Sequence, residues 1–201
     1  MVPRRAPSPD QRQRDADRTR RALLEAALRE FADKGLAGAR TSEIAERAGV
    51  NKQLISYYFG GKQGLYDAIV EQWLAQEREM ADPDTPLDEL VCRYLAVTRQ
   101  QPDLQRLFLR EHLEGDQGAV EPDLDGEDLT EFRRRQAAGE LAPELDPGFV
   151  LIVLQAMVSV GTLFPREVQR LLGLDPTSDE YFTLAEAQLR AIVRRLADDP
   201  S

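Results

Sequence analysis

The stretch TSEIAERAGVNKQLISYYFGGKQGL, residues 41–65, contains two short helical segments on either side of a glycine. Thr41 is placed to cap the first segment with its hydroxyl group. Gly49 is a natural end for that segment, and Asn51 is a natural start for the second, which continues to about Phe59. Two short helices joined by a tight turn that contains glycine predict a helix-turn-helix unit.

The second helix of this unit has an apolar anchor and a polar surface. The apolar residues that should set the angle between the two helices are Ile44, Ala45, Ala48 and Ile55. The residues that should point outward, at DNA, are Lys52, Gln53, Ser56 and Tyr57. In a helix-turn-helix the second helix lies in the major groove, where glutamine pairs with adenine edges and lysine with guanine edges. A small three-helix core alone would not need these side chains on one short surface.

The same stretch resembles the signature of the tetracycline-repressor (TetR) family. The matching positions are Thr41, Ile44 with Ala45, Ala48 with Gly49 and Val50, Tyr58 with Phe59, and Lys62 with Leu65. The segment LLEAALREFADKG also resembles the opening helix of the family, so the specific resemblance covers about residues 18–66. It implies an all-α fold, with an N-terminal three-helix DNA-binding head followed by a larger helical body for ligand binding and dimerisation.

Carried over by position, the resemblance also implies which residues contact DNA. At the start of the two flanking helices these are Thr41, Ser42 and Lys62, and on the recognition helix they are Lys52, Gln53, Leu54, Ser56, Tyr57 and Tyr58. Where the family often has Ser-x-Gly-Thr-Leu-Tyr, this chain has Asn51 followed by Gln53, Leu54, Ile55 and Ser56. The operator sequence therefore cannot be taken from any relative. Gly61 replaces a frequent serine, which weakens the expected cap of the fourth helix.

The charges of the chain are divided unevenly along its length. The net charge is −10, yet residues 1–62 carry 13 Lys and Arg against 8 Asp and Glu, a balance of +5. The balance of residues 63–201 is therefore −15. A basic head on an acidic body indicates that only the head meets a polyanion. We expect residues 1–14, with three prolines and four arginines, to be a mobile arm that is able to follow DNA.

The remaining pattern is helical throughout, and no stretch alternates like a strand. We expect a DNA-binding domain over residues 15–61 and an effector-binding and dimerisation domain over 62–198, with a loop at 115–128. Asp146 with Pro147 should open an apolar helix, and Thr177 with Glu180 should form the capping box of the last helix.

The apolar run FVLIVLQAMVSVGTLF, residues 149–164, has 16 residues and is shorter than the roughly 20 that span a bilayer, which predicts a buried helix and no membrane insertion.

The body is where the resemblance places a dimer interface and an effector pocket. A homodimer on a near-palindromic operator would use the apolar eighth helix and the final helix, whose candidate contacts are Leu154, Val158, Leu189, Ile192 and Leu196. These helices also fit an ordinary intrachain core. The larger or polar side chains that could line a pocket for an unknown small molecule are Trp73, Cys92, Tyr94, Phe108, His112, Gln155 and Met157.

The sequence favours a dimeric, sequence-specific transcriptional regulator, a repressor that a small-molecule ligand releases from its operator. A ligand-independent DNA binder or an activator would have the same helix-turn-helix and stays open. An enzyme is disfavoured, because one histidine and one cysteine leave no credible catalytic set and no metal site. No cofactor is expected. The single Cys92 and the absence of a charged, then apolar, leader favour the cytoplasm.

Overall fold

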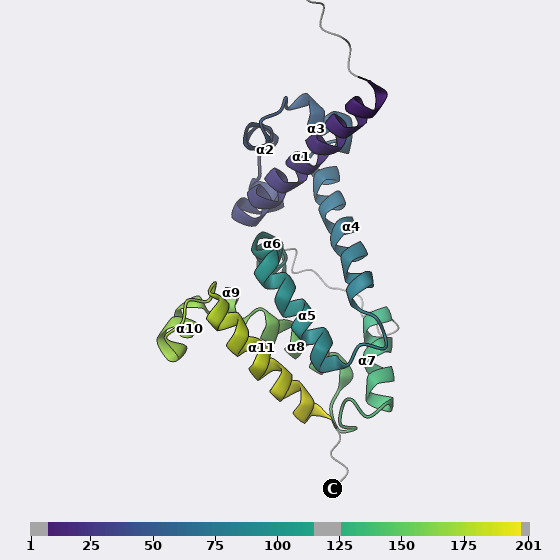
Figure 1. The fold of residues 1–201 in the computed structure, drawn as a ribbon, viewed down its shortest axis with the longest axis vertical. Coiled ribbons are helices and arrows are strands. Elements are labelled where there is room, and N and C mark those ends of the chain that lie inside the picture. Colours follow the sequence, from purple (N-terminus) through teal and green to yellow (C-terminus); the bar gives the residue numbers. More distant parts are fainter. Residues whose placement is uncertain (1–7, 115–125, 198–201) are drawn as a thin grey trace, which may run out of the picture. The chain divides into compact units, whose positions relative to one another are not determined.

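The structure is a computed structural model that describes residues 8–114 and 126–197. Within these residues every regular element is a helix, which confirms the all-α prediction (Figure 1). The described residues form two compact units. The first comprises residues 8–76 and 106–114, and the second comprises residues 77–105 and 126–197. The division between these two units falls inside two helices.

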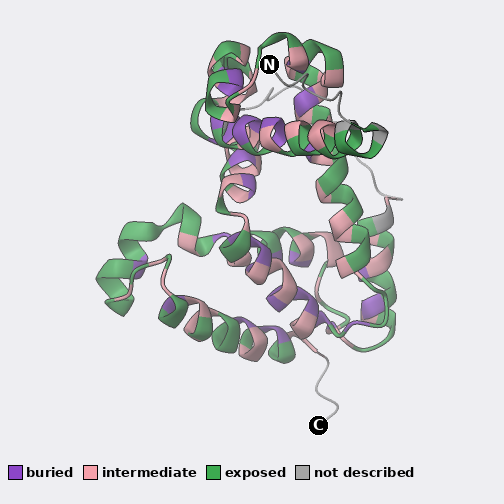
Figure 2. Ribbon diagram, turned by 45° about the horizontal axis from the view of Figure 1, so that its top comes forward, coloured by how far each residue is buried: buried purple, intermediate pink, exposed green. Residues whose placement is uncertain are grey.

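The first unit contains the helix-turn-helix. Its elements are α1 (Pro9–Gly38), α2 (Thr41–Ala48), α3 (Gln53–Phe59), most of α4 (Lys62–Met80) and the later part of α6 (Pro102–Glu114). Buried apolar residues of the first four helices form most of its core, and Figure 2 marks buried positions in purple. Those that are at most 1% exposed are Leu23, Ala27, Phe31, Ile44, Ile55 and Leu65.

Helix α1 begins earlier than the sequence analysis predicted. Residues 9–14 were expected to belong to a mobile arm, but they form the first turns of α1. The Ser8 hydroxyl accepts a hydrogen bond of 3.2 Å from the Gln11 amide, and Pro9 occupies the first turn. These are ordinary helix-start signals that the basic composition obscured. Residues 1–7 of the predicted arm lie outside the described residues. Gly35, at φ 68°, interrupts α1 near its end.

A buried carboxylate joins α1 to α2. Glu30 on α1 is fully buried, and its two oxygens lie 2.8 Å from the Lys34 ammonium and 3.4 Å from the Arg47 guanidinium. Lys34 also donates a hydrogen bond to Glu43 on α2. Hydrogen bonds to Glu30 and then Glu43 raise the pKa of Lys34, and the bond from Lys34 lowers the pKa of Glu43. Burying Glu30 is tolerable because two cations compensate its charge.

The core of the second unit is surrounded by helices from residue 77 onward. Besides the end of α4 and the start of α6, it contains α5 (Leu87–Gln100), α7 (Glu127–Ala137), α8 (Pro147–Val158), α9 (Val160–Leu163), α10 (Pro165–Leu172), α11 (Asp179–Val193) and the 3-10 helix η1 (Arg194–Leu196). Helix α5 packs against α8 and α11, and α8 packs also against α7. Part of the predicted loop, residues 115–125, lies outside the described residues.

Two predicted helix starts in this unit have different outcomes. Asp146 accepts a hydrogen bond of 2.8 Å from the Phe149 amide, so it caps α8 as predicted. The predicted capping box at Thr177 is wrong. The cap of α11 is Ser178, whose hydroxyl accepts a bond of 3.1 Å from the Tyr181 amide. Thr177 instead belongs to the preceding turn, where its hydroxyl group donates to Asp175.

The apolar run at 149–164 does not form one buried helix. The chain breaks it into α8 and α9 at Ser159, and the buried side chains of α8 are Val150 and Leu154. Phe149 and Ile152, on other faces of α8, are 67% and 63% exposed. None of the helices in the described part of the chain combines the length and hydropathy that a membrane crossing requires.

A buried arginine holds α5 and α7 together. Arg135 on α7 is 1% exposed; it donates a bond of 2.8 Å to the Thr85 carbonyl and pairs with Glu131 at 2.9 Å and with Glu140 at 3.0 Å. Glu140 also accepts a bond of 2.8 Å from the amide of Leu87, the first residue of α5. The Glu140 carboxylate therefore compensates the buried charge of Arg135 and also accepts a hydrogen bond from the first amide of α5.

Removing the Glu140 carboxylate should destabilise the protein. We expect Glu140→Ala to lower the free energy of unfolding by about 3 kcal/mol, because the buried guanidinium of Arg135 loses one of its anionic partners. Glu140→Gln should lose less, since an oxygen remains for the Leu87 amide. Urea denaturation measures both. The exposed Glu144→Ala is the control and should change stability by less than about 0.5 kcal/mol; equal losses in control and variant would contradict the role of Glu140.

Candidate functional site

The turn between α2 and α3 has the geometry that the sequence predicts. Gly49 has φ 66° and ψ 31°, the left-handed conformation that ends helices, and the Val50 amide donates a bond of 3.0 Å to the Ala45 carbonyl. The Asn51 side-chain oxygen then accepts a bond of 2.8 Å from the Gln53 amide. The predicted role of Asn51 at the start of the second helix is therefore confirmed.

Helix α3 has one buried face and one exposed face. Ile55 is 1% exposed and fixes the helix to the core of the first unit. The side chains that were predicted to point outward are exposed, namely Lys52, Gln53, Ser56 and Tyr57, and Tyr57 is 78% exposed. A short helix thus presents a cation, an amide, a hydroxyl and a phenol to solvent. These are groups that bind base edges and phosphates.

Leu54 and Tyr58, also predicted to face DNA, are only partly exposed. The Tyr58 ring packs edge-on against Tyr57, with 4.9 Å between ring centroids. The Tyr58 carbonyl accepts a bond of 3.3 Å from Arg20 on α1, whose guanidinium lies 4.7 Å from the Phe59 ring centroid. Tyr58 therefore contributes to positioning α3 as well as to its surface.

The three predicted DNA contacts on the flanking helices, Thr41, Ser42 and Lys62, differ in their surroundings. Ser42 is exposed, and Thr41 is partly exposed as the first residue of α2, with no side chain capping that helix. The prediction that Thr41 caps α2 is therefore wrong by one position. The Lys62 ammonium donates to the carbonyl oxygens of Ala37 and Ala39, at 3.1 and 3.2 Å. These bonds satisfy one acceptor in the last turn of α1 and one just beyond its end, and they leave one of the three N–H donors of Lys62 for another partner.

Sequence analysis missed two residues that hold α3 in place, Arg20 and Gly64. A Cβ atom on Gly64 would lie 1.7 Å from the carbonyl oxygen of Phe59, the last residue of α3. Only glycine admits this close approach between the end of α3 and the first turns of α4. A glycine inside a helical pattern was the available signal, because such a glycine commonly marks a packing constraint.

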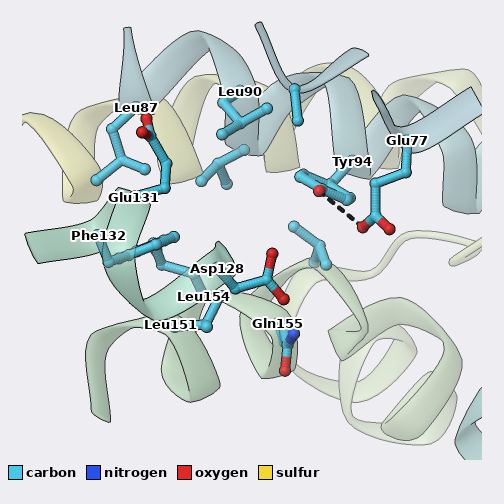
Figure 3. A pocket seen from close by; sticks show the side chains of 13 residues that line it. Glu77, Leu87, Leu90, Tyr94, Asp128, Glu131, Phe132, Leu151, Leu154 and Gln155 are labelled. Carbon is cyan, nitrogen blue, oxygen red and sulfur yellow. Dashed lines mark hydrogen bonds between the residues drawn. The ribbon is translucent and has the colours of Figure 1, made fainter. Parts of the chain in front are cut away.

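The second unit contains a cavity of about 110 Å³ (Figure 3). Apolar residues form much of its lining, among them Leu87, Leu90, Val91, Phe132, Leu151 and Leu154. The polar lining residues are Glu77, Tyr94, Asp128, Glu131 and Gln155. Sequence analysis proposed Tyr94 and Gln155 but missed the three acidic residues, because it considered large and polar residues of the apolar helices and treated carboxylates as surface.

The other five predicted pocket residues do not line this cavity. Cys92 is buried on α5, with its sulfur 3.9 Å from the Glu186 carbonyl, and burial raises the pKa of its thiol. Met157 packs against the core of the second unit. The remaining three belong to the first unit, in which the Trp73 and Phe108 rings are 6.0 Å apart and the His112 Nδ1 lies 2.6 Å from the Phe108 carbonyl.

The predicted dimer contacts are mostly inside the chain's own core. Leu154 and Leu189 are 4% and 6% exposed, and Val158 and Leu196 pack against the same core cluster. Among the five, only Ile192 is substantially exposed, at 44%. The physical reason is that the 3-4 spacing of apolar residues in the last helix arises from packing against other helices of the same chain. The other large exposed apolar side chains of this unit lie on α8, α9 and α10 and between α9 and α10: Phe149, Ile152, Val153, Val160, Leu163, Phe164, Leu171 and Leu172.

Comparisons with known proteins cover both units. The profile for "Bacterial regulatory proteins, tetR family" matches residues 23–69, and that for "Tetracyclin repressor-like, C-terminal domain" matches residues 86–197. The HTH-type transcriptional regulator RutR of Escherichia coli K12 is 29% identical over 196 residues, which is 90% of this chain and 92% of RutR. The HTH-type transcriptional repressor SCO4008 of Streptomyces coelicolor is 31% identical, over 80% of this chain and 86% of that protein.

A solved structure is similar over almost the same length. The crystal structure of SCO4942 from Streptomyces coelicolor has a TM-score of 0.72 and 28% identity, and the match covers 90% of this chain and 99% of that one. The likeness therefore extends through the helix-turn-helix and the helical body together.

Adding a methyl group at Gly64 should displace the end of α3. We expect Gly64→Ala to lower the free energy of unfolding by about 1–3 kcal/mol, because its Cβ would overlap a backbone atom that has no rotamer to adopt. Urea denaturation measures this loss, and amide hydrogen exchange should be faster in α3. Gly38→Ala is the matched control, since its Cβ would lie 3.4 Å from the nearest atom. Unchanged exchange in α3 would contradict the constraint.

Proposed function

This chain belongs to the tetR family of bacterial regulatory proteins, and from that premise we propose that it is a dimeric repressor that a small molecule releases from its operator. It is a DNA-binding transcriptional regulator with a helix-turn-helix and a helical body. The observation that carries the proposal is the exposed face of α3, where a cation, an amide, a hydroxyl and a phenol lie opposite the buried Ile55.

In the proposed complex α3 lies in the major groove and its exposed side chains contact the base edges. Gln53 offers the amide that pairs with adenine, while Lys52 offers a cation for guanine or phosphate. Tyr57, the most exposed of these side chains, offers its ring to a thymine methyl group and its hydroxyl group to a phosphate. Thr41 and Ser42 at the start of α2 are proposed phosphate contacts, as is the third N–H donor of Lys62.

We propose that two copies associate through the exposed apolar faces of α8 to α11. A single reading helix of seven residues contacts only a few base pairs, so two heads on a near-palindrome give the affinity and specificity that one cannot. Phe149 and Ile152 on α8 and Leu171 on α10 are all more than 60% exposed. Apolar side chains gathered in this way favour a protein partner, and a second copy supplies the second head.

Release follows if a ligand in the cavity prefers a conformation in which the paired heads are wrongly spaced. Helix α4 supplies Lys62 to the first unit and Glu77 to the cavity of the second, so it is a covalent link between the two. A coupling of about 1–3 kcal/mol would weaken operator binding roughly 5- to 150-fold.

The DNA-binding proposal predicts loss of binding when the α3 surface is truncated. DNA selected from a random library by the purified protein should contain two inverted half-sites. On that DNA we expect Tyr57→Ala and Lys52→Ala each to weaken binding about tenfold or more, because each removes a groove or phosphate contact from both heads. Fluorescence anisotropy at several salt concentrations measures this.

The matched control is Arg166→Ala, which removes an exposed cation from α10 in the second unit. It should leave DNA affinity within about twofold of the original. If Lys52 contacts phosphate, Lys52→Ala should lower the magnitude of the salt slope by about 1 for each head. Equal affinity in Tyr57→Ala, Lys52→Ala and the control would count against the proposed reading surface.

The dimer proposal predicts that a charge on α8 separates the subunits. We expect the double variant Phe149→Asp and Ile152→Asp to sediment as a monomer at micromolar concentration, because two carboxylates per copy would be buried without partners. Leu113→Asp, at a residue that is 72% exposed in the first unit, is the control and should sediment as the dimer. A dimer that survives both aspartates would place the interface elsewhere.

A further inference from the structure

The size of the cavity limits what it can hold. At about 110 Å³ it is smaller than an engineered protein cavity of about 150 Å³ that binds benzene. Drug-sized ligands occupy pockets of roughly 300–1,000 Å³. The cavity therefore fits one small apolar group, such as a single ring or a branched alkyl chain, and not a fused polycyclic molecule.

The apolar side of the cavity comes from three helices. Leu87 and Leu90 lie on α5, Phe132 lies on α7, and Leu151 and Leu154 lie on α8. Leu87, Leu90, Phe132 and Leu154 are at most 7% exposed, so these walls belong to the packed core. An apolar group placed against them would leave water for an apolar surface, which favours binding.

The polar side of the cavity is acidic. Its three carboxylates are Glu77, Asp128 and Glu131, and the described lining residues include no lysine, arginine or histidine. Glu131 is compensated, because it pairs with Arg134 at 2.7 Å and Arg135 at 2.9 Å. Neither Glu77 nor Asp128 pairs with a lysine or arginine in the described part of the chain.

The two uncompensated carboxylates come from different helices and point toward the same space (Figure 3). Glu77, on α4, accepts a hydrogen bond of 2.9 Å from the Tyr94 hydroxyl group, which fixes the position of its carboxylate. Burial raises the pKa of Glu77, and the charge of Asp128 raises it further, against the lowering effect of the Tyr94 bond. A cation between these groups would relieve both the desolvation and the repulsion.

We propose that the cavity binds a monovalent organic cation whose apolar part is about the size of a benzene ring. The ammonium group lies against Glu77 and Asp128, with the Gln155 side-chain oxygen as a further acceptor, and the apolar part lies against the leucines and Phe132. An arylalkylamine such as benzylamine has this chemistry. That such a cation is the releasing ligand rests on the proposed repressor function, whereas its binding to the cavity does not.

Calorimetric titration of the full-length protein with three probes of equal size tests the proposal. Benzylamine is cationic at pH 7.5, benzyl alcohol is neutral, and benzoate is anionic. We expect benzylamine to bind about tenfold more tightly than benzyl alcohol, with benzoate weakest, because hydrogen bonds to charged groups are stronger and an anion is repelled. Tighter or equal binding of benzyl alcohol or benzoate would overturn the proposal.

Substitutions in the cavity test whether the preference for benzylamine over benzyl alcohol arises there. The double variant Glu77→Gln and Asp128→Asn keeps the shape of the site, and the gap between benzylamine and benzyl alcohol should shrink to about twofold or less. Asp128→Asn alone changes an exposed residue, which makes it the safer variant for folding, and it should reduce the gap about threefold. Glu79→Gln, an exposed residue two positions along α4 that does not line the cavity, should keep the full preference.

A preference that survives the double variant would overturn the cavity assignment. Binding of the selected DNA, measured on the same preparation, separates this inference from the proposed function. DNA binding without benzylamine binding would overturn the inferred ligand and leave the regulator intact. Benzylamine binding without DNA binding would overturn the proposed repressor and leave the cation site supported.

Discussion

A helix of seven residues is too short to persist alone in water, so the surface of α3 exists only because the rest of the first unit holds it. Ile55 lies on the buried face of α3 and packs into the core. At the start of the helix, the Asn51 side chain accepts a hydrogen bond from the Gln53 amide. At its end, Arg20 contacts Phe59, and the missing side chain of Gly64 lets the backbone approach. Every side chain that is not used in this packing is left in solvent, and those side chains have the chemistry that recognises DNA.

Charged residues with a structural role in this protein differ from those with a proposed binding role in whether an oppositely charged partner compensates them. Glu30 in the first unit and Arg135 in the second are almost fully buried, and each has one oppositely charged partner on its own helix and one beyond that helix. Such groups fix one arrangement of helices. Glu77 and Asp128 face the cavity without a cation from the described residues, and their repulsion is an energetic cost that an incoming ammonium group removes.

Features encoded locally were predictable from the sequence, and features set by packing between helices were not. The helix-turn-helix, the exposed side of α3 and the role of Asn51 follow from spacing within a few residues, and the structure has them as expected. Leu154 and Leu189 were assigned to a dimer surface because a helical stripe does not say which neighbour it meets. The acidic lining residues Glu77 and Asp128 were missed for the same reason, since they lie far apart in sequence.

The central claim, that α3 lies against the bases of duplex DNA, is tested most directly by photo-crosslinking. A photoreactive amino acid would replace Tyr57 in one preparation and Phe149, exposed on α8, in another, and each would be irradiated with the selected DNA. We expect covalent attachment to base pairs within each half-site from position 57 and none from position 149. Crosslinks from position 149, with none from position 57, would contradict it.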